Sequence, residues 1–186
     1  IGFTNYVSGV EDLNVNNVTS YSVSGLNAGT TYYFRTRSYN ISGTSSNSNT
    51  ITVLTVPAVP VSTAASTISE TSFTAHWNPS VCASKYYLDV ATDNAFFNVV
   101  AAFNDKDVAN VTSYSATGLA GGTTYYYRIR AYNTSGTSGN SGTISTLTLP
   151  AAPLSTAATS AGETNITANW NAVTGAFGYR LDVSTV

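Results

Sequence analysis

The sequence contains few charged residues, one cysteine and one histidine. Charged side chains make up 9% of its 186 residues, whereas soluble domains contain about 25%. Seven basic residues and a net charge of -2 cannot produce the positive field that a phosphate backbone requires, so a nucleic-acid partner is excluded. Because Cys82 and His76 are the only residues of their types, an intrachain disulfide, a zinc cluster of cysteine and histidine, and a redox pair are also excluded.

Long apolar runs and a secretion signal are also missing. No run approaches the ~20 residues of a membrane span, so we expect no membrane insertion and a targeting sequence that lies elsewhere or has been removed. With 42% apolar residues the chain can form one or two domains with hydrophobic cores. Its 53 serine and threonine residues indicate a surface rich in hydroxyl groups.

The chain repeats itself with a period of 93 residues. The segment NVTSYSVSGL, which starts at Asn17, returns as NVTSYSATGL from Asn110. The alignment of the two halves needs no gap and contains 51 identities in 93 positions. The sequence therefore predicts a tandem array in which each repeat has the same fold.

Two proline-containing stretches divide the repeats. Residues 55–63 and 148–156 show no strand pattern, and proline favours an extended chain that cannot donate fully to a sheet. We expect a domain to begin at Pro57 and another at Pro150. This division predicts the C-terminal half of one domain, a complete domain and the N-terminal half of a third: residues 1–56, 57–149 and 150–186. The last part would then supply what the first part lacks.

Apolar residues alternate with polar ones between turn signals, and no helical period occurs. Strands are expected near residues 60–66, 72–77, 85–91, 96–103, 113–119, 124–132 and 142–148. Seven short strands in a 93-residue repeat predict an all-β, immunoglobulin-like sandwich in tandem. The alternation directs Tyr125, Tyr127, Ile129 and Ala131 into the core. We expect Asp89 to point outward and to face Arg128 or Arg130 across the sheet, in a pair that contributes little if it is exposed.

Two motifs recur in both repeats. A tryptophan stands on the second expected strand, and a Leu-x-x-Gly-Thr-x-Tyr turn opens the sixth; their main residues are Trp77, Trp170, Leu26, Gly29, Tyr32, Leu119, Gly122 and Tyr125. With these motifs the chain resembles the fibronectin type III family, in the Ser/Thr-rich form found in tandem on secreted bacterial surface proteins. The family's turn proline is replaced by Ala28 and Gly121. The resemblance implies a tyrosine corner, in which the tyrosine hydroxyl bonds to upstream backbone. No Arg-Gly-Asp motif occurs, so no adhesive ligand is implied.

Residues that could carry chemistry are isolated from one another. His76 is expected to point outward from its strand, and no nucleophile motif accompanies it. Cys82 lies in an expected loop, where it is a tolerated substitution or a thiol that can be crosslinked or oxidised. Asp105 and Asp107 provide only the minimum for a calcium site, which needs six or more oxygens. We therefore expect no enzyme activity, no metal and no cofactor.

Two surface features leave alternatives open. Five Asn-x-Ser/Thr triplets are glycan acceptors in a eukaryotic secreted protein and ordinary turn residues in a bacterial one; they start at Asn17, Asn40, Asn110, Asn133 and Asn165. Outward tyrosines can stack on sugars or pack on a protein, but they are also common strand formers. The candidates for such weak surface binding are Tyr33, Tyr39, Tyr87, Tyr126 and Tyr132.

We therefore expect a structural role in an extracellular, secreted or cell-surface array that serves as a stalk, adhesin shaft or filament. Neighbouring copies of the same repeat would complete the half-domains, either within one longer chain or by strand donation between chains. The alternative is a binding module of a secreted enzyme or adhesin, with a carbohydrate or a host or cell-surface protein as its partner.

Overall fold

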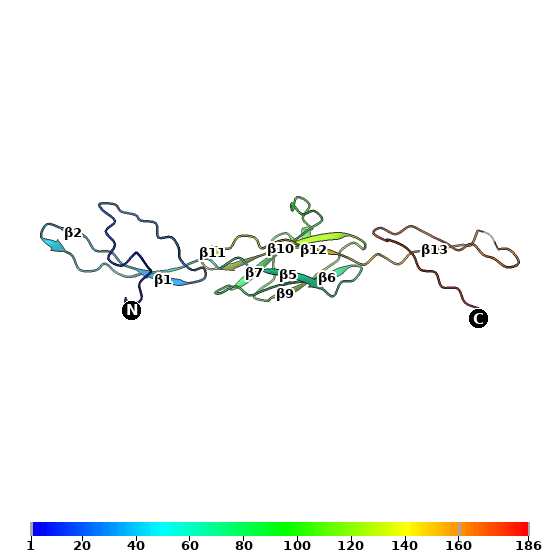
Figure 1. Ribbon diagram of the computed structural model, residues 1–186, viewed down its shortest axis with the longest axis horizontal. Coiled ribbons are helices and arrows are strands. Elements are labelled where there is room, and N and C mark those ends of the chain that lie inside the picture. Colours follow the sequence, from blue (N-terminus) through cyan, green and yellow to red (C-terminus); the bar gives the residue numbers. More distant parts are fainter. Residues whose placement is uncertain (1, 160, 186) are drawn as a thin grey trace.

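The computed structural model describes residues 2–159 and 161–185. It is an elongated chain in which a β-sandwich lies between two more open segments (Figure 1). We call residues 57–149 the central domain, residues 2–56 the N-terminal segment and residues 150–185 the C-terminal segment. We set these boundaries at the predicted linkers.

The central domain consists of two antiparallel sheets. The first has the order β5-β6-β9, and the second has the order β11-β10-β7-β8, with β12 also paired to β10. The strands are β5 (Ser62–Ser66), β6 (Ser72–Trp77), β7 (Lys85–Ala91), β8 (Lys106–Asp107), β9 (Ser113–Thr117), β10 (Thr124–Asn133), β11 (Gly136–Thr137) and β12 (Ile144–Leu147). The prediction of an all-β chain is confirmed, and a single 3-10 turn (Ala101–Phe103) is the only helix among the described residues.

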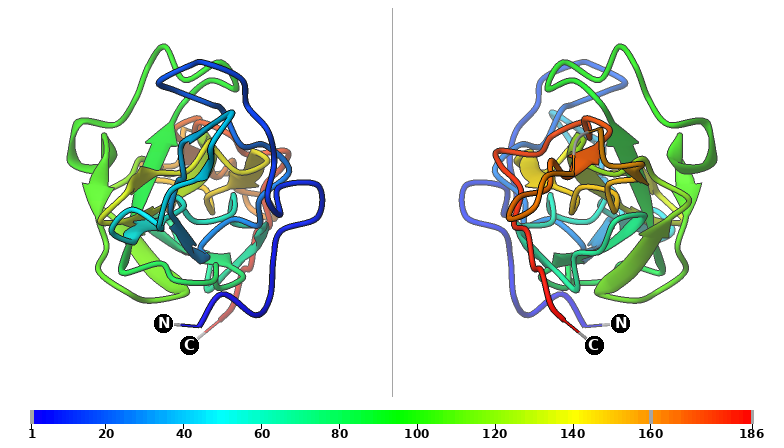
Figure 2. Two further views of the ribbon diagram at one scale, coloured as in Figure 1. Left: turned by 90° about the vertical axis from the view of Figure 1, so that its left-hand side faces the viewer. Right: turned by 90° about the vertical axis from the view of Figure 1, so that its right-hand side faces the viewer.

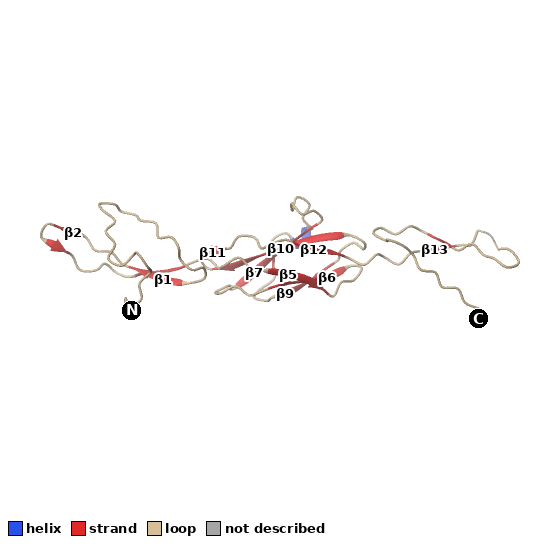
Figure 3. Cartoon of the chain, in the orientation of Figure 1, coloured by secondary structure: helices blue, strands red, loops and turns tan. Residues whose placement is uncertain are grey.

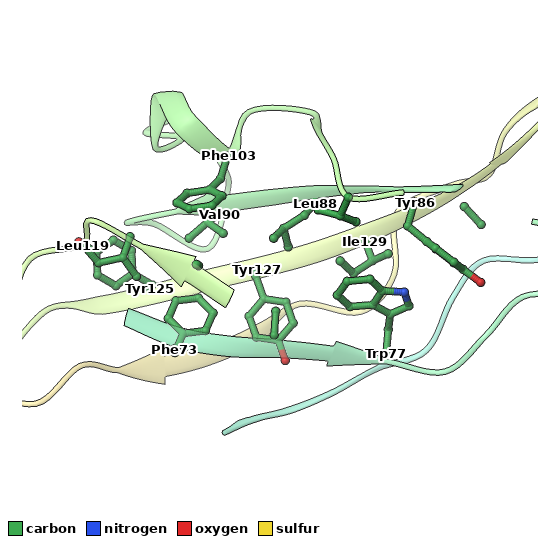
Figure 4. Packing of buried hydrophobic residues seen from close by; sticks show 14 residues of the cluster. Phe73, Trp77, Tyr86, Leu88, Val90, Phe103, Leu119, Tyr125, Tyr127 and Ile129 are labelled. Atoms are coloured by element: carbon green, nitrogen blue, oxygen red, sulfur yellow. The ribbon is translucent and has the colours of Figure 1, made fainter. Parts of the chain in front are cut away.

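The core lies between the two sheets and is built by the alternation along each strand (Figure 4). On β10 the side chains of Tyr125, Tyr127, Ile129 and Ala131 are buried, as the sequence predicts. Phe73 on β6 faces them, with its ring centroid 5.7 Å from that of Tyr127. The Tyr127 hydroxyl donates to the backbone oxygen of Thr63, which ties the two sheets together. The core is therefore aromatic in its middle, as tyrosine at alternate positions requires.

The prediction of a strand over residues 96–103 is wrong. The chain forms a turn there, touches the sheet through an isolated bridge between Ala91 and Val99, and ends in the 3-10 turn. The cause is Asp93, whose carboxylate accepts hydrogen bonds from the backbone nitrogens of Ala95, Phe97 and Asn98. These bonds fold the backbone back on itself, because a side chain that satisfies consecutive N–H groups competes with sheet pairing.

The two flanking segments contain little regular strand (Figure 3). In the N-terminal segment β1 pairs with β4 and β2 pairs with β3, and in the C-terminal segment β13 pairs with β14. Their bounds are β1 (Thr31–Phe34), β2 (Tyr39–Asn40), β3 (Gly43–Thr44), β4 (Ile51–Leu54), β13 (Ser155–Thr156) and β14 (Asn169–Trp170). Each segment thus keeps local pairings of the central domain without a second sheet to cover them.

Candidate functional site

The Leu-x-x-Gly-Thr-x-Tyr turn of both repeats has the hydrogen bond that a tyrosine corner requires. Tyr125 lies at the start of β10, and its hydroxyl oxygen accepts a hydrogen bond of 2.9 Å from the backbone nitrogen of Ala120. In the N-terminal segment the Tyr32 hydroxyl accepts from the nitrogen of Asn27, also at 2.9 Å. Gly122 and Gly29 have φ of 60° and 59°, a left-handed conformation that glycine adopts without strain. The turn is therefore the same rigid unit in both places.

The tryptophans predicted to be equivalent have different surroundings. Trp77 is buried in the central domain, where its ring lies 5.7 Å from that of Tyr86. Trp170 lies at 5.6 Å from Tyr179, so the same ring pair forms, but 37% of Trp170 is exposed. The C-terminal segment thus has the local geometry of a domain core without its cover.

Asp89 is the charged residue that the structure buries most deeply. It points away from the core, as predicted, but the loop that follows β7 covers it and leaves its side chain only 4% exposed. Its carboxylate accepts from Nε of Arg128 at 2.9 Å, from Nη2 of Arg130 at 3.1 Å and from the backbone nitrogen of Asp105 at 2.8 Å. Asp89 thus faces the arginines across the sheet as expected, and it meets both of them in a pair that the loop keeps largely out of water.

The arginines of this cluster also hold the covering loop. Arg130 forms a second ion pair, at 2.7 Å, with the carboxylate of Asp105. The guanidinium of Arg128 lies 4.0 Å from the centroid of the Phe96 ring. The N-terminal segment has the same two contacts one period earlier: Arg37 pairs with Asp12 at 2.5 Å, and Arg35 lies 4.0 Å from the ring of Phe3. We call these four residues the arginine cluster of the N-terminal segment.

The candidate calcium ligands are occupied by cations of the protein itself. Asp105 is bound to Arg130, and Asp107 is bound to Nζ of Lys85 at 2.8 Å. Among the described residues no three His, Cys, Asp or Glu side chains form a group that could hold a metal ion. Both carboxylates thus form ion pairs within the protein.

The Lys85 bond lowers the pKa of Asp107 below its ordinary value of 3.8, and the backbone nitrogen of Ala109 adds to the effect. A carboxyl whose pKa is lowered on folding stabilises the fold above its ordinary pKa and loses that contribution as the pH falls through the lowered value. We expect Lys85→Gln to raise the pKa of Asp107 toward 3.8, measured by NMR titration of the side-chain carboxyl. Asp93 is the matched control, because its pKa is lowered by backbone N–H groups, with Asn98 first, and it should not respond. An unchanged Asp107 would contradict the ion pair.

The candidate tyrosines do not gather on one surface. Tyr87 and Tyr132 form an edge-to-face pair with ring centroids 6.0 Å apart. The Nζ atom of Lys85 lies 4.8 Å from the centroid of the Tyr87 ring and 5.0 Å from that of the Tyr132 ring. Tyr126 is half-buried near the other end of β10, whereas Tyr33 and Tyr39 belong to the N-terminal segment and are exposed. A lysine thus occupies the ring faces that a sugar would need.

His76 contacts a serine of the neighbouring strand, and Cys82 lies in an exposed turn. The Nε2 atom of His76 lies 2.7 Å from the hydroxyl of Ser66 on the neighbouring strand. Cys82 is exposed and has φ of 56°, and the residue one period later is Gly175 with φ of 71°. The loop therefore needs a left-handed residue at this position, which is a structural requirement that the sequence comparison alone did not identify.

The two ends of the central domain carry contacts that the sequence did not reveal. At one end Gly29 lies so close to the loop of Val81 that a Cβ on this glycine would overlap the Val81 carbonyl. At the other end Gly122 meets the carbonyl of Thr174 in the same way. Val81 and Thr174 are one period apart, as are the two glycines. We call these the first and second junctions; the same turn and the same loop meet at both.

A polar contact accompanies the first junction. The side-chain nitrogen of Asn133, at the end of β10, donates to the backbone oxygen of Thr55 at 2.9 Å. Its side-chain oxygen accepts from the nitrogen of Ser135 at 2.9 Å. Asn133 is buried, so this member of the Asn-x-Ser/Thr triplets acts as a turn residue that also holds the linker. The repeated sequence YNxSGTS was the available signal for it.

The comparisons with known proteins agree with this architecture. Residues 58–147 match the family model of the fibronectin type III domain. The central domain is a fibronectin type III domain. Domains of this family are generally non-catalytic modules and are commonly extracellular. The described part of the chain has no helix of the length and apolarity that crossing a membrane would require.

Two curated proteins share sequence with the chain over regions longer than this domain. A Kelch domain-containing protein of Saccharolobus solfataricus is 32% identical over 126 residues, which are 67% of this chain and 17% of that protein. Exoglucanase B of Cellulomonas fimi is 28% identical over 127 residues, which are 63% of this chain and 11% of that protein. The chain thus spans less than a fifth of the length of either relative.

Two solved structures of single domains are also similar to part of the chain. The FN5 domain of Drosophila Lar is 24% identical and covers 50% of this chain and 98% of its own, with a TM-score of 0.41. The domain of human fibronectin type III domain containing protein 3 is 22% identical and covers 51% and 88%, with a TM-score of 0.42.

Proposed function

We propose that this chain is a non-catalytic segment of an extracellular array of fibronectin type III repeats, which acts as a stalk, adhesin shaft or filament. The observation that carries this proposal is the recurrence of one head-to-tail contact at both ends of the central domain. A contact that repeats with the sequence period fixes the same geometry between each pair of neighbours, as in other repeat arrays.

The junctions leave little freedom at the linkers. The Gly29 nitrogen donates to the oxygen of Val56 at 2.8 Å, and the Gly122 nitrogen donates to the oxygen of Leu149 at 2.9 Å. Each turn thus binds the start of its own linker while it touches the loop of the next unit. Proline follows in both linkers and keeps the backbone extended. Short, bonded, proline-containing linkers favour a stiff rod over a flexible string.

The flanking segments supply the second argument, because their core side chains are exposed. Tyr127 and Leu88 are 0% exposed in the central domain, whereas Phe34, one period before Tyr127, is 52% exposed and Leu181, one period after Leu88, is 58% exposed. Exposing several large apolar side chains on one face is costly in water, and such faces mark interaction surfaces.

The N-terminal segment also surrounds an open hollow of about 1280 Å³, whose lining includes Tyr21, Val23, Phe34 and Val53. The central domain fills the corresponding space with β6 and β7, whose inward residues are Phe73, Leu88 and Val90. The C-terminal segment contains the counterparts of those two strands. A neighbouring copy of the same repeat is therefore the partner that fits both segments.

The test is the shape of longer arrays. Fusions of two and four copies of the 186-residue chain, imaged by negative-stain electron microscopy, should be straight rods whose length grows by an equal step for each added copy. The rods should show domains at even spacing, including where one copy meets the next. Particles that bend freely at the linkers, or that collapse into compact shapes, would contradict a role as a shaft.

A carbohydrate-binding module is the second candidate, and the similarity to an exoglucanase favours it. Its surface would be the Tyr87 and Tyr132 pair, with Lys85 as a polar group. Isothermal titration of the chain with glucan oligosaccharides tests it, and Tyr132→Ala should abolish the signal whereas Tyr39→Ala should not. Because Lys85 already lies against both rings, we expect no saturable binding and prefer the structural role.

A further inference from the structure

The arginine cluster of the N-terminal segment lacks the residue at the centre of its counterpart. In the central domain the register of β7 and β10 places Asp89 opposite Arg128, and its carboxylate bridges Arg128 and Arg130. One period earlier stand Arg35 and Arg37, both exposed, and Arg37 has Asp12 as its partner just as Arg130 has Asp105. No described residue of the chain takes the bridging position of Asp89.

The chain carries the missing carboxylate at its other end. Asp182 stands one period after Asp89, in the sequence YRLDVST, and it is exposed without an ion pair to any described residue. Resting on the proposed array, we infer that Asp182 of a second copy of this chain bridges Arg35 and Arg37 and sets the register in which the two copies join. The strand around Asp182 would lie beside β1 as β7 lies beside β10.

Charge balance supports this partner. At the join Arg180 replaces Tyr87 and brings a third arginine next to Arg35 and Arg37. Glu11 replaces Asn104 and brings a carboxylate, in addition to Asp12 and Asp182. The joined surface thus holds three arginines and three carboxylates. Two substitutions of opposite charge compensate each other across the join, which gives electrostatic complementarity between the copies.

A polar contact between the two copies fits the same arrangement. Asn40 has the turn geometry of Asn133, since its side-chain oxygen accepts from the nitrogen of Ser42 at 2.9 Å. Asn133 uses its amide nitrogen to hold Thr55, and the residue one period after Thr55 is Thr148. A Cβ on Gly43 would meet nothing within 4 Å, whereas one on Gly136 would meet Val56. The amide nitrogen of Asn40 in the copy that carries Arg35 and Arg37 is thus placed to donate to the backbone oxygen of Thr148 in the copy that carries Asp182.

The shape of the molecule permits repeated joining. Viewed end-on, the dark blue segment that follows the N label and the red segment that precedes the C label lie on the same side of the long axis (Figure 2). They lie at opposite ends of that axis (Figure 1). A second copy that is displaced along the axis therefore brings its red segment next to the blue segment of the first, with little rotation.

The experiment is a charge swap between two variants of the 186-residue chain, followed by sedimentation velocity. We expect the unaltered chain to form linear end-to-end species. Asp182→Arg alone, and Arg35→Asp with Arg37→Asp, should each weaken association roughly tenfold or more, and an equimolar mixture of the two variants should restore it. Glu163→Arg is the matched control, because it reverses the charge of another exposed carboxylate in the C-terminal segment that does not correspond to Asp89. Unaltered melting of the central domain would show that all variants remain folded.

Three results would overturn the inference. One is an effect of Asp182→Arg no larger than that of Glu163→Arg, and another is a mixture that does not associate. The third is an unaltered chain that stays monomeric. None of these results affects the rod shape of covalent fusions, so the inference and the proposed function fail separately.

Discussion

Replacing Phe73 with alanine is expected to lower the free energy of unfolding of the central domain by about 3–5 kcal/mol, the usual cost of removing a buried aromatic ring. Phe73 is 0% exposed, and its ring lies 5.7 Å from Tyr127 and 6.3 Å from Tyr125. The substitution leaves a cavity between the sheets at the point where the two tyrosines meet the opposite face. Because both rings are held by hydroxyl hydrogen bonds to the backbone, they cannot move to fill it.

The measurement is urea denaturation followed by tryptophan fluorescence in a Trp170→Phe background, so that buried Trp77 alone reports on the central domain. Phe97→Ala is the control, since Phe97 is 88% exposed in the loop after β7. It should change stability by about 0.5 kcal/mol or less. Equal losses for the two substitutions would mean that the sandwich core is not where the structure places it.

The strands of the central domain could be predicted from sequence because apolar side chains that point into the core alternate with side chains that point away from it. The bounds predicted for residues 72–77 and 85–91 are those of β6 and β7. On β10 the burial alternates at every residue from Thr124 to Asn133, so the period of two is visible without knowledge of the partner strands. The tyrosine corner was implied by the resemblance to the fibronectin type III family, and a local turn fixes its geometry.

The segment after β7 was mispredicted because side-chain chemistry outweighs strand propensity there. Residues 96–103 are rich in apolar residues, which favours a strand. The Asp93 carboxylate just before them accepts hydrogen bonds from their backbone and so produces a turn. The burial of Asp89 follows from that turn, since the loop that covers it must first fold back. A sequence pattern describes residues that are close along the chain. It does not show which loop covers an outward residue in the folded structure.

The contacts at the domain ends were invisible for a different reason. Gly29, Gly122 and Asn133 were noted as turn residues, and that role is real. Their second role, contact with the next unit, depends on how two units are placed in space. The sequence records it only indirectly, as residues that recur in both repeats where the turn alone would tolerate substitution.

Gly122→Ala is expected to disrupt the second junction. At φ of 60° an alanine costs about 1 kcal/mol in the turn itself. Its Cβ would also overlap the carbonyl of Thr174, which is backbone and cannot rotate away as a side chain would. The loop that contains Thr174 and Gly175 must therefore move off the turn. We expect the C-terminal segment to swing relative to the central domain, seen by small-angle X-ray scattering as a broader distribution of distances.

Gly118→Ala separates the two costs. Gly118 has φ of 74° in the same domain, so an alanine there also adopts a left-handed conformation, but its Cβ would meet nothing within 4 Å. Both variants should therefore lose similar stability in the central domain, whereas only Gly122→Ala should change the scattering. If both variants scatter like the unaltered chain, the contact at Gly122 does not hold the units in line. The rod would then depend on the linkers alone, and the recurrence of the junction would no longer support a shaft.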